Sequence, residues 1–137
     1  AIRAKGGMVN DTDAWSAFVS AVNNLDSKRR AVGITTSSAT TINFYNSQGN
    51  SSTSYYVQVT GLTFMPSVII LTRNSGSTIG YPRVAVDKTA PLVGGYTLIN
   101  RNGSFFRLDG VSAYIDSSSF RLPYENGSES VYWIAYE

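Results

Sequence analysis

The sequence predicts an all-β protein, an antiparallel β-sandwich head preceded by a short N-terminal helical neck. Three observations lead to this prediction. Short segments are dense in β-branched and aromatic residues, turn-forming dipeptides separate them, and a helical period occurs only near the start. Many short strands at such spacing indicate a sandwich or barrel. We therefore assign residues 1–30 to a neck and residues 31–137 to a head domain.

The centre of the predicted head is the segment of residues 55–72. Tyr55, Val57 and Val59 alternate with polar residues or a tyrosine, which is the pattern of a strand with one face in a core. Residues 68–71 are apolar without interruption, as expected of a strand buried on both faces. A glycine and a proline interrupt both patterns between these two strands, and we expect a connection there.

Further strands are predicted wherever the same residue types recur between turn formers. Asn-Gly at 102–103 and at 126–127, and Asp-Gly at 109–110, favour the positive φ angles of tight hairpin turns. The last third of the chain is therefore predicted to be a meander of consecutive hairpins. The full set of predicted strands comprises residues 31–36, 40–45, 55–60, 68–72, 81–86, 96–100, 105–108, 111–115, 119–122 and 131–136.

A helix is predicted over residues 12–27. Trp15, Phe18, Val22 and Leu25 follow a 3-4-3 spacing, which places them on one helical face. The helix would be roughly 24 Å long. Its apolar stripe has two possible partners, the sheet of its own domain or copies of itself around an axis. We favour the second, an oligomeric neck.

Composition excludes several kinds of chemistry. The chain has no cysteine, so it can form neither a disulfide nor a thiolate zinc site, and it has no histidine for Ser-His or Cys-His catalysis. We expect no cofactor and no metal. Only 15% of residues are charged, and acidic and basic residues balance after Arg30, so no basic stripe for nucleic acid is expected. The sequence also has no long apolar run for membrane insertion.

Polar side chains on predicted loops form the candidate binding site. Amides donate and accept hydrogen bonds, which matches sugar hydroxyls, and guanidinium groups can bind hydroxyl pairs or a phosphate. Asparagine beside glycine or serine is also ordinary turn chemistry, and the sequence leaves that alternative open. The candidates on these loops are Asn46, Gln48, Asn50, Arg73, Asn74, Arg101 and Asn102.

An up-and-down order of strands would place alternate loops at opposite ends of the head. The loops expected far from the neck are residues 46–54, 73–80, 101–103 and 116–118. The loops expected near it are residues 61–67, 87–95, 109–110 and 122–130. The candidate binding residues all belong to the far set.

Aromatic residues and carboxylates give weaker signals. Tyr81, Tyr96 and Tyr124 stand at predicted strand ends or in loops, where a ring can lie under a sugar, although tyrosine is equally common within sheets. Trp133 alternates with apolar neighbours and is expected in the core. Two carboxylate pairs have the residue types of a glycosidase, but their spacing singles out neither, so no enzyme is expected. These pairs are Asp109 with Asp116, and Glu125 with Glu129.

Two segments carry a family resemblance. Residues 59–71, Val-Thr-Gly-Leu-Thr-Phe-Met-Pro-Ser-Val-Ile-Ile-Leu, resemble tail-fibre and receptor-binding proteins of bacteriophages, and residues 131–137, Val-Tyr-Trp-Ile-Ala-Tyr-Glu, resemble their closing strand. Both segments are also similar to the H-type lectin domain, a trimeric antiparallel sandwich that binds sugars. The Trp-His pair that contacts sugar in the animal lectins is not carried over, because this chain has no histidine.

The resemblance implies the C-terminal head of a phage or prophage tail fibre at the tip of a virion. Such a head is a non-enzymatic homotrimer attached to an upstream fibre shaft, and it recognises a bacterial surface polysaccharide or teichoic acid, with Arg73, Arg83 or Arg101 beside a phosphate. Tyr81 would be part of the same site. Other possibilities are a structural trimerisation cap without a ligand, a polysaccharide depolymerase, and a free lectin of non-phage origin.

Overall fold

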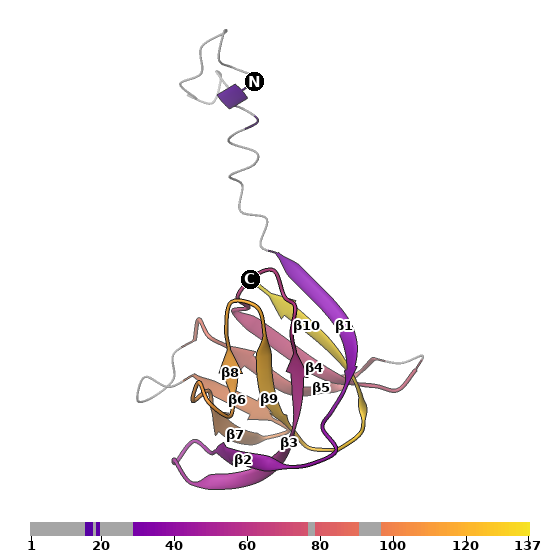
Figure 1. The fold of residues 1–137 in the computed structure, drawn as a ribbon, viewed down its shortest axis with the longest axis vertical. Coiled ribbons are helices and arrows are strands. Elements are labelled where there is room, and N and C mark those ends of the chain that lie inside the picture. Colours follow the sequence, from indigo (N-terminus) through magenta and orange to yellow (C-terminus); the bar gives the residue numbers. More distant parts are fainter. Residues whose placement is uncertain (1–15, 18, 20–28, 77–78, 91–96) are drawn as a thin grey trace.

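The structure is a computed structural model that describes residues 16–17, 19, 29–76, 79–90 and 97–137. The described part from Arg29 onward is all-β (Figure 1). Most of the predicted neck and of the predicted helix over residues 12–27 lies outside the described residues. The strands are β1 (Arg30–Thr36), β2 (Ile42–Tyr45), β3 (Ser51–Val59), β4 (Val68–Asn74), β5 (Ile79–Asp87), β6 (Leu98–Arg101), β7 (Ser104–Arg107), β8 (Tyr114–Ile115), β9 (Phe120–Tyr124) and β10 (Ser130–Tyr136).

The strands form two antiparallel sheets. One sheet has six strands in the order β1-β10-β4-β5-β6-β7, and the other has four in the order β2-β3-β9-β8. A single bridge between Asn46, which follows β2, and Phe106 of β7 joins the edge strands of the two sheets. The two sheets therefore form a curled half-barrel that is closed on this side and resembles a sandwich.

The core lies between the sheets and confirms the predicted role of residues 55–72 in part. Val57, Ile69 and Leu71 are fully buried, as their alternation requires. The uninterrupted run of residues 68–71 was predicted to be buried on both faces, and this is wrong, because Val68 and Ile70 are only half-buried. No second layer within the described residues covers that side of β4.

Each predicted strand corresponds to an observed one, with shifted ends. β3 begins four residues earlier than predicted, because the residues Ser51–Ser54 pair with β2. β8 is shorter than predicted. The Asp109 carboxylate accepts hydrogen bonds from the backbone N–H groups of Val111 and Ala113, at 3.1 and 2.8 Å, so this stretch is a turn.

The predicted meander is wrong as a continuous arrangement. The β6–β7 hairpin forms at Asn102 and Gly103, whose φ angles of 47° and 85° fit a tight turn, and β8 pairs with β9. The chain passes from one sheet to the other between β7 and β8, and again between β9 and β10. These two passages contain the other two predicted turns.

The predicted sorting of loops into two ends also fails for residues 116–118. The Ser118 carbonyl accepts a hydrogen bond from the Leu62 N–H at 2.8 Å, and the nearby Thr63 carbonyl accepts one from the Arg29 guanidinium, also at 2.8 Å. Arg29 marks the place where the chain enters the head. Residues 116–118 therefore lie at the entry end, since the broken meander reverses the alternation on which the prediction depended.

Candidate functional site

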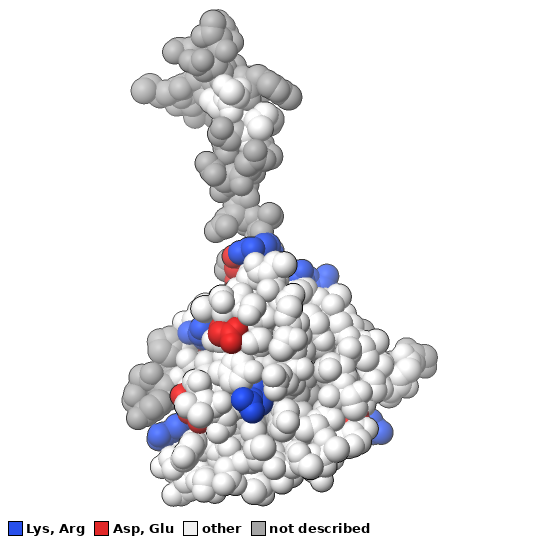
Figure 2. Space-filling model, in the orientation of Figure 1, with Lys and Arg blue, Asp and Glu red and all other residues white. Residues whose placement is uncertain are grey.

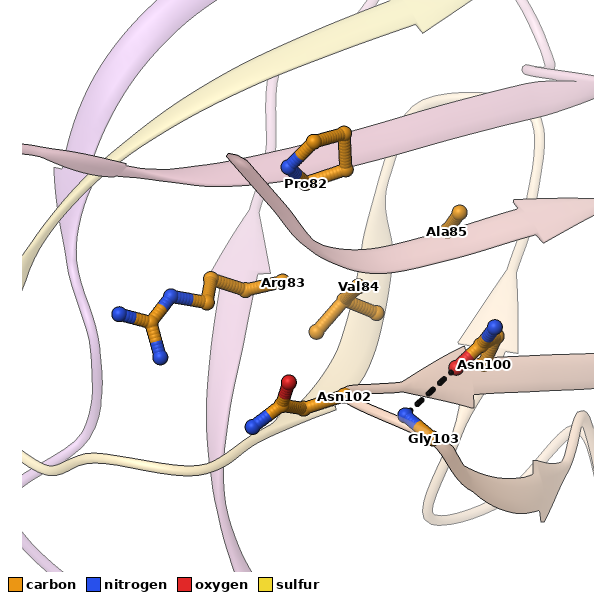
Figure 3. A pocket seen from close by; sticks show the side chains of 7 residues that line it. All are labelled: Pro82, Arg83, Val84, Ala85, Asn100, Asn102 and Gly103. Carbon is orange, nitrogen blue, oxygen red and sulfur yellow. Dashed lines mark hydrogen bonds between the residues drawn. The ribbon is translucent and has the colours of Figure 1, made fainter. Parts of the chain in front are cut away.

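Two hollows flank the β6–β7 hairpin. We call the first the turn hollow, because it lies between this hairpin and the β2–β3 turn, and its volume is about 310 Å³. We call the second the strand hollow, because it lies along β5 and β6, and its volume is about 220 Å³. The turn hollow is lined by Asn46, Ser47, Gln48, Ser52, Arg101, Ser104, Phe105 and Phe106. The strand hollow is lined by Pro82, Arg83, Val84, Ala85, Asn100, Asn102 and Gly103 (Figure 3).

The β2–β3 turn is fixed by its own first residue and by β7. The Asn46 side-chain oxygen accepts the backbone N–H groups of Gln48 and Asn50, at 3.0 and 2.9 Å, which is a standard use of asparagine in a turn. The Ser47 carbonyl accepts two hydrogen bonds from the Arg107 guanidinium, at 2.9 and 3.2 Å. This anchoring presents the exposed Gln48 side chain at the rim of the turn hollow.

Arg101 forms the inner wall of the turn hollow. Its guanidinium is half-buried, lies 4.6 Å from the ring centroid of Phe106, and donates a 2.6 Å hydrogen bond to the hydroxyl of Ser54. Burial lowers the pKa of Arg101, while the nearby charge of Glu125 opposes this effect. Its Nε is buried and has no hydrogen-bond partner. The turn hollow is thus lined by a partly desolvated cation whose unpartnered Nε lies below the surface.

Arg101 shares its buried, unpartnered Nε with Arg121, but it differs from three other arginines in its charge partners. Arg29, Arg73 and Arg83 each form an ion pair with a glutamate, whereas no carboxylate among the described residues pairs with Arg101. Figure 2 shows few charges on a mostly uncharged face of the head. No carboxylate of the described residues lines the turn hollow, although the charge of Glu125 acts on Arg101 from nearby.

The polar side chains that line the strand hollow have more partners within the protein than those of the turn hollow. Arg83 pairs with Glu125, and the Asn102 amide donates to the other carboxylate oxygen of Glu125 at 2.8 Å. Figure 3 shows the side chain of Arg83, from β5, and that of Asn102, from the β6–β7 turn, extending in the same direction. The Asn100 side chain accepts the Gly103 N–H. Glu125 belongs to residues 122–130, which were predicted at the opposite end from residues 101–103. That separation is wrong.

The hollows bring together most of the residues predicted from sequence. Asn46, Gln48 and Arg101 line the turn hollow, and Asn50 belongs to the same turn. Arg83 and Asn102 line the strand hollow.

Besides Asn50, three further predicted residues line neither hollow. Tyr81 is 90% exposed and directly precedes Pro82, which lines the strand hollow. Arg73 and Asn74 lie at the end of β4, where Arg73 pairs with Glu129 at 2.9 Å and the Asn74 amide donates to the Ser130 hydroxyl at 3.0 Å. Their polar groups fasten β4 to β10.

The sequence reasoning missed Phe105 and three serines of the turn hollow. Phe105 is 46% exposed, whereas its neighbour Phe106 is buried in the core. The signal was present, because adjacent residues of a strand face opposite sides, so one of two successive phenylalanines must point away from the core. Ser47, Ser52 and Ser104 have no comparable signal, since serine is common in turns and on any exposed strand.

The aromatic candidates divide between core and surface. Tyr124 is fully buried and its hydroxyl donates to the Glu129 carboxylate at 2.7 Å, so it is no platform for a ligand. Burial is the main cause that raises the pKa of Tyr124. Trp133 packs on the core, edge to face with Phe120 at 5.9 Å between centroids, as predicted. Tyr96 lies outside the described residues.

The carboxylates of the two proposed glycosidase pairs have structural partners. Asp109 caps a turn, Glu125 binds Arg83 and Asn102, and Glu129 binds Arg73 and Tyr124. Asp116 accepts backbone and side-chain hydrogen bonds from Ser118 and Ser119, which lower its pKa. A general acid in glycoside hydrolysis needs the opposite, a raised pKa.

The described residues include no group of three His, Cys, Asp or Glu side chains that could hold a metal ion. Within the same part of the chain, no helix is both long enough and apolar enough to cross a membrane. Comparison of the chain with protein families, curated proteins and solved structures found no match.

Proposed function

We propose that this chain is the receptor-binding head of a bacteriophage tail fibre and that it binds a bacterial surface carbohydrate in the turn hollow. The observation that supports this most directly is the convergence of a glutamine amide, an unpaired guanidinium and an exposed phenylalanine ring from distant parts of the sequence. These residues are Gln48, Arg101 and Phe105. Amide and guanidinium groups match the hydroxyls of a sugar, and an aromatic ring can pack against its apolar face.

The positive charge of Arg101, with which no carboxylate of the described residues forms an ion pair, favours a ligand with an anionic group. A teichoic acid or a phosphate-bearing wall polysaccharide is such a ligand. Arg73 and Arg83, the other two arginines that the sequence suggested for this role, already bind glutamates. A guanidinium binds a phosphate well because it offers several donors in one plane. In the proposed homotrimer, attached to a fibre shaft, the sites of the copies would act together and raise the apparent affinity.

The test compares two glutamines in binding to purified wall polysaccharide or teichoic acid. Gln48 lines the turn hollow, whereas Gln58 is exposed on β3 and lines neither hollow. We expect Gln48→Ala to weaken binding about tenfold, since it removes hydrogen bonds worth about 1.4 kcal/mol together. Gln58→Ala should leave binding unchanged. Calorimetric titration measures both.

Two results would contradict the proposal. Equal losses in Gln48→Ala and Gln58→Ala would place the ligand elsewhere on the head. No binding of the unsubstituted chain to host envelopes or to their purified polysaccharides would favour a fibre cap without a ligand. Released oligosaccharide in the same mixtures would indicate a depolymerase.

A further inference from the structure

The outer face of the six-stranded sheet, the side turned away from the four-stranded sheet, is unusually apolar at β1, β10 and β4. Val32, Ile134 and Ile70 lie opposite one another in neighbouring strands and therefore share this face. Val32 is 46% exposed, and Ile34 on the same side of β1 is 63% exposed. Tyr132, opposite Ile34, is half-buried. Large exposed aliphatic side chains that adjoin one another mark an interaction surface.

β1 is also an unprotected edge strand. It is the first strand in the sheet order, and among the described residues no strand pairs with its second side. Residues 31–36 contain no charge and no proline, and their pairing with β10 has no bulge. Charges, prolines and bulges are the usual means by which monomers keep an edge strand from pairing with other chains. Their absence here favours an edge that is covered in the assembled protein.

The sequence that precedes β1 favours a second copy of the chain as the partner that covers it. Glu137 binds Arg29 through its carboxylate and its backbone N–H, and Arg29 directly follows the predicted neck segment in the sequence. That segment carries the apolar stripe of Trp15, Phe18, Val22 and Leu25, whose heptad spacing is typical of helices that pair with copies of themselves. Association through this stripe would bring the β1 strands of different copies close to one axis.

We propose that the outer face of β1, β10 and β4 docks a second copy of this chain. The contact is aliphatic on both sides, with Val32 and Ile34 at its centre, and it removes from water the apolar surface that a single copy exposes. It goes beyond the proposed function, because it requires no carbohydrate and no intact turn hollow. It also concerns the head itself, so it is separate from any contact made by the neck.

The first test is the mass of the full chain in solution, measured by light scattering over a dilution series. We expect the unsubstituted chain to be oligomeric and Ile34→Glu to shift it toward monomer at the same concentration, because a charge would be buried at the contact. Val111→Glu is the matched control, since Val111 is 76% exposed in a loop outside this face. Circular dichroism verifies that both variants fold. A monomeric unsubstituted chain, or the same mass for Ile34→Glu as for the unsubstituted chain, would overturn the proposal.

The second test uses the absence of cysteine from the sequence. A thiol-reactive dye should label Ile34→Cys several-fold more slowly than Val111→Cys, and dilution into the monomer range should remove this protection. Protection that persists in a monomer would show that the segment of residues 12–27 of the same chain covers the face, and would overturn the proposal. Equal labelling rates at concentrations where the chain is oligomeric would also overturn it.

Discussion

At the scale of single residues, a part-buried hydrogen bond and an ion pair hold the β9–β10 connection in place. Tyr124 is fully buried, and its hydroxyl donates to Glu129, which also pairs with Arg73. The Glu129 side chain is only 12% exposed, so an oxygen left without a donor is poorly hydrated. The same contacts keep Glu125, a few residues earlier, beside Arg83 and the strand hollow.

Replacing this hydroxyl should destabilise the head. We expect Tyr124→Phe to lower the free energy of unfolding by about 1 to 2 kcal/mol, because it removes one hydrogen bond to a charged, buried acceptor. Tyr45→Phe is the control, since Tyr45 is 46% exposed. Urea denaturation followed by fluorescence measures both. A similar loss in the two variants would mean that the buried hydrogen bond has no special role.

A second prediction at this scale concerns acid stability. Hydrogen bonds from the Arg29 side chain, and then from its backbone N–H, lower the pKa of Glu137 from 4.5 to about 2. A carboxylate with a depressed pKa in the folded state stabilises the fold above its unfolded pKa and loses that contribution as the pH falls. The stability advantage of the unsubstituted chain over Glu137→Gln should therefore be complete above pH 4.5 and vanish as the pH approaches 2. Thermal melts across this range measure it, and an advantage that does not depend on pH would contradict the assignment.

At the scale of elements, the packing of β1 on β10 depends on the absence of a side chain. A Cβ at Gly33 would lie 2.6 Å from Cζ2 of Trp133, because the indole ring covers the glycine. Gly33 and Trp133 lie opposite each other in the two strands, and the Trp133 ring packs edge to face against Phe120 in the core. The strand can thus stay close to its neighbour on the inner side while it exposes Val32 and Ile34 on the outer side.

Replacing Gly33 by alanine should lower the stability of the head, although such a replacement in a strand usually raises stability. Alanine normally suits a strand interior better than glycine does, but here we expect Gly33→Ala to destabilise the head by about 1 to 3 kcal/mol through overpacking. The smaller ring of Trp133→Phe should reduce this cost when both changes are combined. A double-mutant cycle by urea denaturation gives the coupling, and strictly additive effects would show that the clash relaxes elsewhere.

At the scale of the whole molecule, the proposed carbohydrate site and the proposed contact between copies predict different dependences on assembly. The turn hollow lies within one chain, between β2–β3 and β6–β7. Its affinity for a single soluble oligosaccharide should therefore not require other copies. Attachment to a surface that carries many receptors should require them, because linked sites multiply the apparent affinity.

Ile34→Glu separates these two contributions. We expect the variant to bind a soluble wall oligosaccharide as the unsubstituted chain does. It should bind whole cells or envelopes at least tenfold more weakly, because avidity typically raises apparent affinity by about a hundredfold or more. Calorimetry and a cell-binding assay measure the two quantities. Parallel losses in both assays would mean that the substitution disturbs the turn hollow, and no loss in either would mean that attachment needs one copy alone.

The sequence predicted individual strands well and their assembly poorly. Val57 and Val59 fall in a strand whose alternation of side chains is a local property of the extended backbone, readable from neighbouring residues. The passages from β7 to β8 and from β9 to β10 between sheets depend on contacts between distant segments. The Asn-Gly and Asp-Gly signals were the same at real hairpins and at these passages. Local turn chemistry therefore could not distinguish a hairpin from a passage between sheets.

The candidate site shows the same division. Asn46, Gln48 and Arg101 were chosen for their functional groups, and the bridge between Asn46 and Phe106 brings them together. Arg73 was chosen for the same reason, yet it pairs with Glu129 because β4 lies beside β10. Whether a polar loop residue remains available to a ligand depends on its neighbours in space.

The sequence by itself determined the available chemistry and the positions of the strands. Without cysteine and histidine the chain has no thiol or imidazole groups, and its period-two segments mark the strands from β1 to β10. Only the tertiary structure decided the order of strands in the sheets, the pairing of Arg83 with Glu125, the unpartnered Nε of Arg101 and the outer face that the described residues leave exposed at Val32 and Ile34. The physical reason is the distance along the sequence over which each interaction acts. Backbone geometry acts between neighbouring residues, whereas burial and ion pairing depend on which distant segments the closed fold brings into contact.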